Sequence, residues 1–299
     1  MKVAVLHGGS TAEREVSLKS GAMVLAALRA RGVDAHGFDP ADKGLEDLIA
    51  GRFERAFLAL HGRFGEDGTL QGALEWLGLR YTGSGVLGSA LAMDKQRAKR
   101  MWMAEGLPTP PFEILGPDSD LRGVATRLGL PLMVKPAREG SSVGMSKVRA
   151  AGDLDEAYAL AVNCDRTVLV EKFIEGAEIT AGIIGDEALP LIRIETPRDF
   201  YDSHAKYLAD DTRYLIPCGL EAERERQVQQ LCLRAFRALG CSGWGRVDVM
   251  VDRAGDPWLI EANTAPGMTD HSLVPIAARA AGLSYEDLCM RILEGSHVG

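Results

Sequence analysis

One segment, residues 245–268, restricts what this chain can fold into more than any other. It reads GRVDVMVDRAGDPWLIEANTAPGM, in which two alternating runs, residues 246–252 and 257–263, flank the turn-forming sequence DRAGD. Alternation with a period of two, interrupted by such a turn, is typical of a β-hairpin. The segment is therefore predicted to form two antiparallel strands joined by a tight turn.

Symmetry about the Ala-Gly step at residues 254–255 determines which residues of this hairpin lie opposite each other. It pairs Asp248 with Glu261 and Arg246 with Asn263, and these four side chains then share one face. The other face would pack on a core. It collects the apolar residues Val247, Val249, Val251, Trp258, Ile260 and Ala262.

The polar face of the hairpin suggests a metal site. Two opposed carboxylates repel, so a positive group is expected between them. The oxygens of Asp248, Glu261 and Asn263 suit a hard cation such as Mg²⁺, with Mn²⁺ as another possibility. A polar face turned toward solvent would show the same pattern, and a one-residue slip would move one strand's residues to the other face. The Pro-Gly turn that follows, whose N–H groups could face the same site, favours binding.

Composition limits the class of protein. With 299 residues, 46% of them hydrophobic, the chain is long enough for two or three globular domains. Its net charge of −8 argues against nucleic acid or a membrane surface as the main partner, because phosphate groups require a basic surface. Five scattered cysteines without a Cys-x-x-Cys pair indicate reduced and mostly buried residues. We therefore expect a cytoplasmic protein without a signal peptide or membrane span.

Two strand-to-loop transitions near the N-terminus predict a crevice. A strand at residues 2–7 leads through a Gly-Gly-Ser turn into a helix, and a strand at 55–60 leads into the loop HGRFGEDG. Ligands bind in loops at the carboxyl ends of strands in α/β sheets. Glu13 and His61, one in each loop, are therefore expected to face one crevice, although a lone histidine after a strand more often has a local structural role.

Three stretches in the middle of the chain suggest a nucleotide site. A strand at residues 130–136 places Lys135 before the small-residue loop at 138–144, whose N–H groups could approach phosphate oxygens. A strand at 168–174 offers edge backbone groups and an aromatic side chain for a flat heterocycle. The polar stretch at 199–213 is typical of a lid. Each stretch taken alone could also be an ordinary turn, strand or loop.

A Gly-rich break at residues 81–85 predicts the first domain boundary. The helical pattern at residues 86–106 follows it and contains a charged cluster. Such clusters are usually solvated helix faces, and this is the interpretation for Asp94, Lys95, Arg97, Lys99 and Arg100.

Five motifs, read together and in order, resemble those of the D-alanine–D-alanine ligases. They are HGRFGEDG at 61–68, EGSSVGM at 139–145, AKY at 205–207, GWGRVD at 243–248 and EANTAPGM at 261–268. The resemblance implies a mixed α/β (α+β) protein with the ATP-grasp fold. It also implies three domains: a Rossmann-like N-terminal α/β domain at 1–84, a small central domain at 85–171 and a C-terminal domain at 172–299.

The resemblance assigns residues to ATP and to metal. Those at the ATP phosphates and in the flap above them are Lys95, Lys135, Ser142 and Val143. Those at the adenine and ribose are Glu171, Lys172, Phe173, Ile174 and Glu178. Asp248, Glu261 and Asn263 match the ligands of two Mg²⁺ ions, in agreement with the hairpin face.

Amino-acid substrates are assigned in the same way. Glu13 would hold the ammonium of the first D-alanine and would be linked through Ser141 to Tyr207 on the lid. The other matched positions are His61 at the first carboxylate, Ser272 and Leu273 at the second, Lys206 at the transferred phosphate, and Arg246 with the N–H of Gly267 at the oxyanion. The implied reaction joins two D-alanines through an acyl phosphate for peptidoglycan synthesis. A homodimer with only small-molecule substrates is implied as well.

Two rival functions remain open at this point. Another ATP-grasp carboxylate–amine ligase, or one that uses D-lactate, would share the fold, but Glu13, Ser141 and Tyr207 favour an amine as second substrate. A catalytically silent nucleotide-binding protein would not need Arg246 or the predicted metal ligands. The departures from the family pattern are Phe64, Ser203 and Ala265, and none of them is a predicted ligand.

Overall fold

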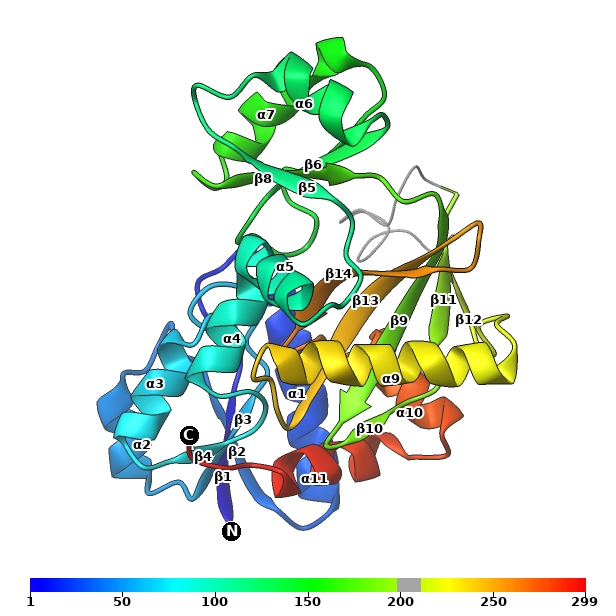
Figure 1. Cartoon of the computed structure of the whole chain (residues 1–299). Helices are drawn as coiled ribbons and strands as arrows, with labels where there is room; N and C mark the ends of the chain where they lie inside the picture. Colours follow the sequence, from blue (N-terminus) through cyan, green and yellow to red (C-terminus); the bar gives the residue numbers. More distant parts are fainter. Residues whose placement is uncertain (198–210) are drawn as a thin grey trace.

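The structure is a computed structural model, and it describes residues 1–197 and 211–299. The strands of these residues form three sheets. Figure 1 shows a lobe built on the second sheet, which stands above a body that contains the first and third sheets.

The first sheet is parallel, with strand order β2-β1-β3-β4. Its elements are β1 (Lys2–Leu6), α1 (Arg14–Ala30), β2 (Asp34–Phe38), α2 (Leu45–Gly51), β3 (Arg55–Leu58), α3 (Thr69–Trp76) and β4 (Arg80–Tyr81). Because β1 and β3 are adjacent and parallel, the loops that follow them emerge side by side. The sequence predicted both strands and the helix α1, but it did not predict β2.

The second sheet is antiparallel, with strand order β5-β8-β6-β7. Its elements are β5 (Phe112–Leu115), α6 (Leu121–Leu128), β6 (Leu132–Pro136), β7 (Ser146–Val148), a 3₁₀ turn (Ala151–Asp153), α7 (Leu154–Val162) and β8 (Val168–Lys172). Helix α6 begins after Asp120, whose carboxylate accepts a hydrogen bond from the N–H of Gly123 and so caps the helix. The two helices and the sheet enclose a core of their own.

The third sheet contains the hairpin. Its strand order is β12-β11-β9-β13-β14, and a short strand, β10, pairs with β9. The strands are β9 (Gly176–Ile184), β10 (Glu187–Ala188), β11 (Ile192–Glu195), β12 (Arg213–Leu215), β13 (Trp244–Asp252) and β14 (Pro257–Asn263). Strand β13 lies between β9 and β14, so the hairpin is part of a larger sheet in which β14 is the edge.

Three helices accompany one face of the third sheet. They are α4 (Val86–Met93), α5 (Lys95–Ala104) and α9 (Ala222–Ala238). Trp102 of α5 is fully buried, and its indole N–H donates to the carbonyl of Ala235 in α9 at 2.9 Å. The predicted domain boundaries at 84 and 171 stay predictions. The division at 84 assigns α4 and α5 to the central domain, but these helices contribute to the core of the third sheet.

The end of the chain packs against its beginning. Helices α10 (Leu273–Ala280) and α11 (Tyr285–Glu294) share one core with β1 and α1. Beyond α11, His297 pairs with Tyr81 of β4 through two backbone hydrogen bonds of 2.9 and 3.1 Å. One of the two hydrophobic cores of the first sheet therefore depends on residues from the last part of the chain.

Two predictions from composition can be compared with this fold. All five cysteines are free, and four of them are buried, as predicted. None of the helices within residues 1–197 and 211–299 is both long enough and apolar enough to cross a membrane.

Candidate active site

The hairpin brings its four polar residues together as the sequence predicted. Asp248 lies opposite Glu261, and Arg246 lies opposite Asn263. The predicted core residues of β13 are also buried, since Val247 and the other valines of that strand are at most 4% exposed. The pairing predicted for the candidate metal site is thus confirmed.

A β-bulge between the turn and these pairs was not predicted. Val249 pairs with Leu259, whereas its neighbour Asp248 pairs with Glu261, so Ile260 is an extra residue in β14. The turn is also one residue shorter than predicted. Val251 pairs with Pro257, whereas symmetry about residues 254–255 would pair it with Trp258. The two offsets cancel. The predicted pairing at the polar face is therefore right, although the predicted symmetry of the turn is wrong.

The bulge changes which residues of β14 face the core. Leu259 is fully buried, while Trp258 and Ile260 are only partly buried, which corrects the prediction that these two belong to the apolar face. The indole N–H of Trp258 instead donates to Asp252 at 2.9 Å. A bulge adds one residue to one strand and so exchanges the faces on one side of it.

Hydrogen bonds from three side chains hold the carboxylate of Asp248. Arg246 donates from Nε and Nη2 to the two carboxylate oxygens, each at 2.8 Å. Thr180 of β9 donates to Oδ1 at 2.6 Å, and the amide of Asn263 donates to Oδ2 at 3.2 Å. A bidentate bond of this kind fixes both groups in one plane. Asp248 and Arg246 are therefore fixed relative to each other.

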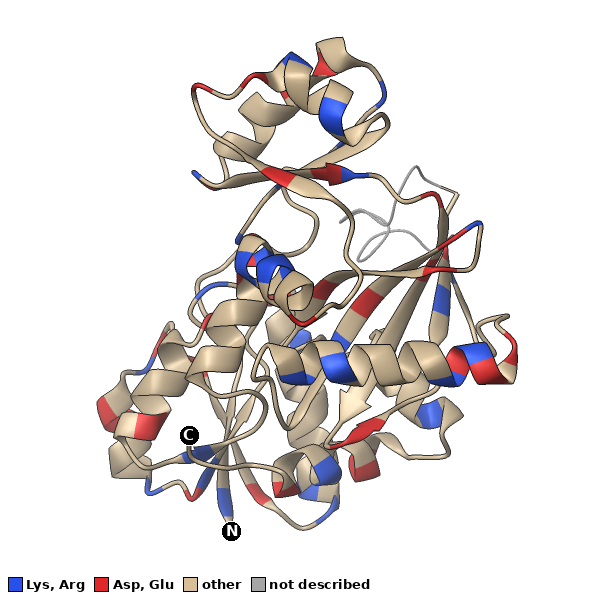
Figure 2. Cartoon of the chain, viewed as in Figure 1, with Lys and Arg blue, Asp and Glu red and all other residues tan. Residues whose placement is uncertain are grey.

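Glu261, the other acid of this face, is paired with Lys95 at the start of α5. The ammonium of Lys95 lies 3.3 Å from the carboxylate of Glu261 and donates to the carbonyl of Glu139 at 2.8 Å. Figure 2 shows the basic residues of α5 beside acidic residues of β13 and β14. Each of the two predicted metal-binding acids thus has a cation beside it.

The oxygen atoms of this face fit a hard cation in kind, but protein ligands alone are few. In the described parts of the chain, no three His, Cys, Asp or Glu side chains come together as a metal site. Asp248, Glu261 and Asn263 would supply two carboxylates and one amide. Mg²⁺ is usually bound by one or two carboxylates, with waters and substrate phosphates as its other ligands. The set therefore fits a metal that binds together with a nucleotide.

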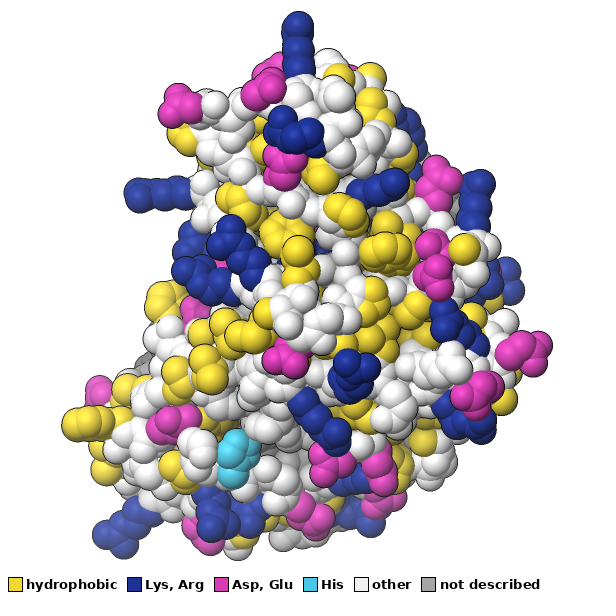
Figure 3. Space-filling view, viewed as in Figure 1, with side chains coloured by type: hydrophobic (Ala, Val, Ile, Leu, Met, Phe, Trp, Pro, Cys, Tyr) yellow, Lys and Arg dark blue, Asp and Glu magenta, His cyan; other side chains and the backbone are white. Residues whose placement is uncertain are grey.

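A cleft of about 490 Å³ lies between the second and third sheets. Of the residues predicted at the nucleotide and the metal, those that line it are Lys95, Lys135, Ser142, Val143, Glu171, Lys172, Phe173, Ile174, Glu178, Asp248 and Glu261. Its apolar walls were not predicted; they include Met133, Met145, Met250 and Ile260. Figure 3 shows hydrophobic side chains gathered at the junction of lobe and body. Apolar walls with a few convergent polar groups suit a flat ring with a charged tail.

A buried group of charges lies at the floor of this cleft. Glu171 is 3% exposed, and its two oxygens lie 2.5 Å from the ammonium of Lys135 and 2.7 Å from that of Lys99. Burial alone would raise the pKa of Glu171, but the two lysines hold it below its ordinary value. Burial lowers the pKa of Lys99 to about 8, although the neighbouring charge of Glu171 acts to raise it. Lys99 is fully buried, so its assignment to a solvated helix face was wrong; Lys95 and Asp94 of that cluster are buried too.

The predicted adenine edge is the end of β8 and the residues that follow it. The N–H groups of Lys172 and Phe173 donate to the carbonyls of Pro111 and Pro131, at 2.9 and 3.0 Å. The ammonium of Lys147 lies 3.6 Å from the ring centroid of Phe173. These contacts fix the position of the strand end that borders the cleft.

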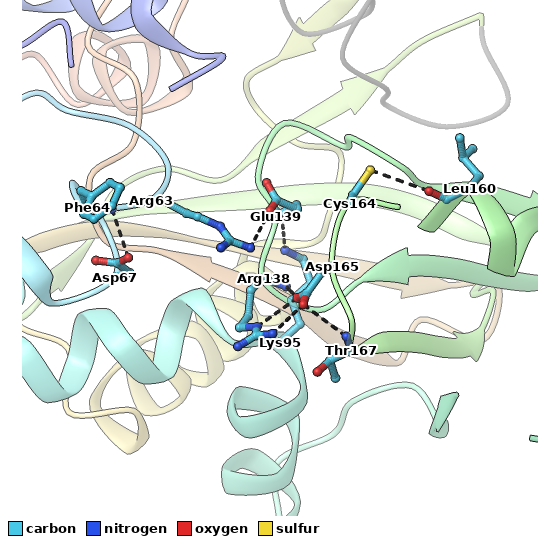
Figure 4. Close-up of polar contacts among 10 residues, drawn as sticks. All are labelled: Arg63, Phe64, Asp67, Lys95, Arg138, Glu139, Leu160, Cys164, Asp165 and Thr167. Atoms are coloured by element: carbon cyan, nitrogen blue, oxygen red, sulfur yellow. Dashed lines mark hydrogen bonds and ion pairs between the residues drawn. The ribbon is translucent and has the colours of Figure 1, made fainter. Parts of the chain in front are cut away.

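The loop at residues 138–144 is anchored at its beginning. Arg138 donates to Asp165 from Nε and Nη2, at 3.0 and 2.6 Å, and Arg63 pairs with Glu139 at 2.9 Å. Figure 4 shows these contacts together with the bond from Lys95 to the carbonyl of Glu139. Further along this loop, two consecutive serines have left-handed backbone conformations, with φ of 50° and 59°. Such conformations are strained for residues other than glycine.

The predicted first-substrate residues lie next to this loop. Glu13 immediately precedes α1 and accepts a hydrogen bond from the hydroxyl of Ser141, which confirms that these two residues are linked. His61 is buried and contacts the carbonyl of Ala265 at 3.0 Å and the hydroxyl of Ser20 at 3.4 Å. Burial lowers the pKa of His61, so the ring is neutral at pH 7.

The turn after β14 contains the other two predicted substrate groups. Gly267 lies where a Cβ atom would be 2.8 Å from the hydroxyl of Ser272, so a side chain there would require Ser272 to shift. Ser272 precedes α10 and accepts a hydrogen bond from the N–H of Thr269 at 2.9 Å, and Leu273 is buried as the first residue of the helix. The N-terminus of a helix is a favourable place for a carboxylate.

Known proteins match the whole length of the chain. A family model described as the D-ala D-ala ligase C-terminus matches residues 101–294, and one described as the N-terminus matches residues 39–84. A D-alanine–D-alanine ligase of Cupriavidus pinatubonensis is 59% identical over 296 residues, which are 98% of this chain and 90% of the relative. One of Nitrosospira multiformis is 57% identical over 298 residues, covering 100% and 97%. The chain belongs to the D-alanine–D-alanine ligase family.

A solved member of this family has the same fold. The D-alanine–D-alanine ligase of Bacillus anthracis, in a structure of its complex with ATP, is 35% identical with a TM-score of 0.87. The match covers 99% of this chain and 97% of that protein. The chain therefore has the ATP-grasp fold of D-alanine–D-alanine ligases, as the motifs implied.

Lys206 and Tyr207 lie outside the described residues, as does Ser203. The resemblance to D-alanine–D-alanine ligases assigns the first two to the lid. Of the predicted lid at residues 199–213, the structure describes 211–213.

Three residues beside the ligase site were missed from the sequence, and each had a signal. Lys99 lies four residues after Lys95, on the same side of α5. Thr180 is a polar residue between Ile179 and Ala181 in the buried part of β9. Glu66 belongs to the HGRFGEDG motif and accepts from the N–H of Gly62 at 2.6 Å. Burial and the charge of Glu13 raise the pKa of Glu66 to about 8.

Proposed function

We propose that this chain is an ATP-dependent ligase that joins two D-alanine molecules to D-alanyl-D-alanine for peptidoglycan synthesis. Family membership supports the reaction. The observation that carries the proposal is that three predicted parts of the site are contiguous: the cleft, the Asp248–Glu261 face and the Glu13–Ser141 contact. Lys95 connects them, since it contacts Glu261 and the carbonyl of Glu139, the residue that begins the EGSSVG loop.

The first step requires positive charge, because a carboxylate is a poor electrophile until it is activated. In our proposal the γ-phosphoryl group of ATP passes to a carboxylate oxygen of the first D-alanine, and ADP leaves. Lys95 and Lys135 neutralise the phosphate oxygens during this transfer. The position of both lysines in the cleft supports these roles.

The second step forms the peptide bond. The amine of the second D-alanine, after losing a proton from its ammonium form, attacks the acyl phosphate carbon, and inorganic phosphate leaves with the electrons of the broken C–O bond. Arg246 and the N–H of Gly267 would stabilise the oxyanion that develops in between. The rigid bidentate contact of Arg246 with Asp248 supports this role, because a preorganised donor needs no rearrangement during the reaction.

Recognition of the two amino acids involves the N-terminal sheet and α10. We assign Glu13 to the ammonium of the first D-alanine and neutral His61 to the neighbourhood of its carboxylate. Ser272 and Leu273, at the start of α10, would receive the carboxylate of the second. Lys206 and Tyr207 are proposed as lid residues on resemblance alone.

Asp248, Glu261 and Asn263 would hold two Mg²⁺ ions, and Mn²⁺ has the same ligand preference. When bound, the metal supplies charge neutralisation at the phosphates. We also propose the three-domain division at 84 and 171, a homodimer and a cytoplasmic location. These rest on the resemblance, and a D-lactate-using ligase is the alternative that the first experiment tests.

The experiment that tests the function measures phosphate release from Mg²⁺-ATP, with the organic product identified by mass. D-alanine should support release and give the dipeptide, whereas L-alanine should not. If D-alanine plus D-lactate gives mainly the ester, the second-substrate assignment is wrong. Release without any condensed product would contradict the ligase assignment itself.

The metal assignment has its own test in Asp248→Asn and Glu261→Gln. Each should reduce turnover by at least about 100-fold, the scale on which electrostatic groups act in active sites. Each should also raise the Mg²⁺ concentration needed for half-maximal rate, and removal of Mg²⁺ by a chelator should stop the wild type. The matched control is Asp256→Asn, in the same hairpin, because that side chain is 69% exposed. Wild-type turnover in either site variant would refute the assignment.

A further inference from the structure

Lys99 is a fully buried cation that the proposed mechanism does not use. Its ammonium lies 2.7 Å from the carboxylate of Glu171 and donates to the hydroxyl of Thr109 at 2.7 Å. It also donates to the carbonyl of Leu259 at 3.4 Å. These partners come from β8, from the segment before β5 and from β14. Lys99 therefore lies where the second sheet meets the third.

One side of this junction leads to the nucleotide cleft. Glu171 bridges Lys99 and Lys135, so the three buried charges alternate as cation, anion and cation with a net charge of +1. Lys135 and Glu171 both line the cleft, whereas Lys99 lies behind them. A buried carboxylate stays ionised only when opposite charges compensate for lost solvation. Lys99 contributes one of those two charges.

The other side of the junction leads to the metal-binding strand. The carbonyl of Leu259 accepts from Lys99 and, at 2.8 Å, from the hydroxyl of Thr109. Leu259 is the residue directly before the bulge at Ile260, and Glu261 follows the bulge. Lys99 and Thr109 thus fix the backbone at Leu259, on the turn side of the bulge. The bulge in turn sets the direction of the Glu261 side chain.

Volume filling alone does not explain such an arrangement. Apolar side chains of similar size usually fill a buried space at equal or lower cost in free energy than ions do. What a buried lysine adds is a defined geometry for the charged groups around it.

We propose that Lys99 is a positioning residue for nucleotide binding: it holds Glu171, which in turn fixes the ammonium of Lys135 at the phosphate end of the cleft. The proposal rests on the proposed function only in assigning the cleft to ATP. Lys99 touches neither substrate nor metal in this account. Its contact with Leu259 couples the same ammonium to the strand of Glu261.

The test compares Lys99→Met with Arg100→Met, the next residue of the same helix, which is basic but exposed. Direct binding of ADP and of a non-hydrolysable ATP analogue is measured by calorimetry, and KM is measured for ATP and for D-alanine. Lys99→Met should weaken nucleotide binding and raise KM for ATP by about 10-fold or more, the scale known for residues that orient direct ligands. KM for D-alanine should change less than about 2-fold, and Arg100→Met should match the wild type in all of these values.

A purely structural role gives a different result. Lost folding would reduce the fraction of active protein and hence the apparent kcat, while nucleotide affinity and both KM values stayed as in the wild type. Unchanged nucleotide affinity in folded Lys99→Met overturns the proposal. Equal changes in both KM values overturn it too, because the effect would then not be specific to the nucleotide.

A second variant keeps the proposal testable if Lys99→Met does not fold. Glu171→Gln keeps the shape of the bridging residue and removes its charge, so it should weaken nucleotide binding to a similar extent. If Lys99 acts through Glu171, the double variant should bind ADP no more weakly than Glu171→Gln alone. Additive losses would show that Lys99 acts by another route. Because the binding assay contains no D-alanine, normal nucleotide binding without dipeptide formation would count against the proposed reaction and not against the role of Lys99.

Discussion

Replacing Gly62 by alanine should weaken binding of the first D-alanine by displacing Glu13. Gly62 has φ of 76°, and a Cβ atom added there would lie 2.8 Å from Oε2 of Glu13. Ordinary van der Waals contact begins at 3.4 Å, so the carboxylate would have to withdraw by ~0.6 Å. Glu13 also accepts the hydrogen bond of Ser141, and this contact restricts where the carboxylate can go.

The size of the effect follows from that displacement. A misplacement of about 1 Å in a catalytic or binding group can reduce rates by about 100-fold. We therefore expect Gly62→Ala to raise KM for the first D-alanine about 10-fold, equivalent to ~1.4 kcal/mol. The left-handed backbone should separately destabilise the fold by about 1 kcal/mol, because alanine lacks the conformational freedom of glycine.

Gly78→Ala is the matched control. Gly78 also has a positive φ, 67°, but nothing lies within 4 Å of an added Cβ atom. Both variants should therefore lose similar stability in urea unfolding, and only Gly62→Ala should change KM, measured by initial rates at saturating ATP. If the two variants have the same KM for D-alanine, the contact with Glu13 has no functional weight and the reasoning fails.

Two further predictions concern the response of stability to pH. Glu66 has a folded pKa of about 8, far above its unfolded value, so its burial destabilises the protein increasingly as pH rises from about 4.5 to 8. The stability of Glu66→Gln relative to the wild type, measured by urea unfolding, should therefore rise over this interval by at most ~1.4 kcal/mol per pH unit. A pH-independent difference between the two proteins would contradict the assigned pKa. Asp165 behaves oppositely. Although burial opposes ionisation, hydrogen bonds from Arg138 and from backbone N–H groups lower its pKa. Its contribution to stability is therefore present above its unfolded pKa and lost as pH falls. Asp165→Ala should cost about 2–3 kcal/mol at pH 7 and clearly less near pH 3, and an equal loss at both pH values would reject the ionic contribution.

The polar face of the hairpin could be predicted because it depends on local sequence. A period of two and a turn fix which residues share a face, and a turn shortened by one residue together with a one-residue bulge leaves that result unchanged. The bulge itself could not be predicted from the hairpin alone. Strand β13 also pairs with β9, and such non-local pairing influences where a strand can twist or bend. Trp258 and Ile260 were misassigned because the bulge in β14 moves them away from the apolar face.

Lys99 shows the other limit of prediction from sequence. Its neighbours on α5 are charged, and although its spacing of four residues from Lys95 places both on one side of the helix, a helix taken alone does not show which side is covered. It is covered by β8 and β14, which are about 70 and 160 residues away in sequence. Strand β9 was missed for a related reason, since its glycines and alanines weaken the pattern of a strand whose burial comes from neighbours on both sides.

The shared core of the two ends of the chain has a consequence for synthesis. Residues of β1 and α1 are buried against α10 and α11, and His297 closes the edge of the first sheet at Tyr81. On the ribosome the first sheet leaves the exit tunnel early, yet the helices that complete its core are made about 200 residues later, which takes roughly 10–40 s at bacterial elongation rates. During that time the face of the sheet that packs with α10 and α11 lacks part of its native cover, so we expect this face to be accessible to chaperones and proteases.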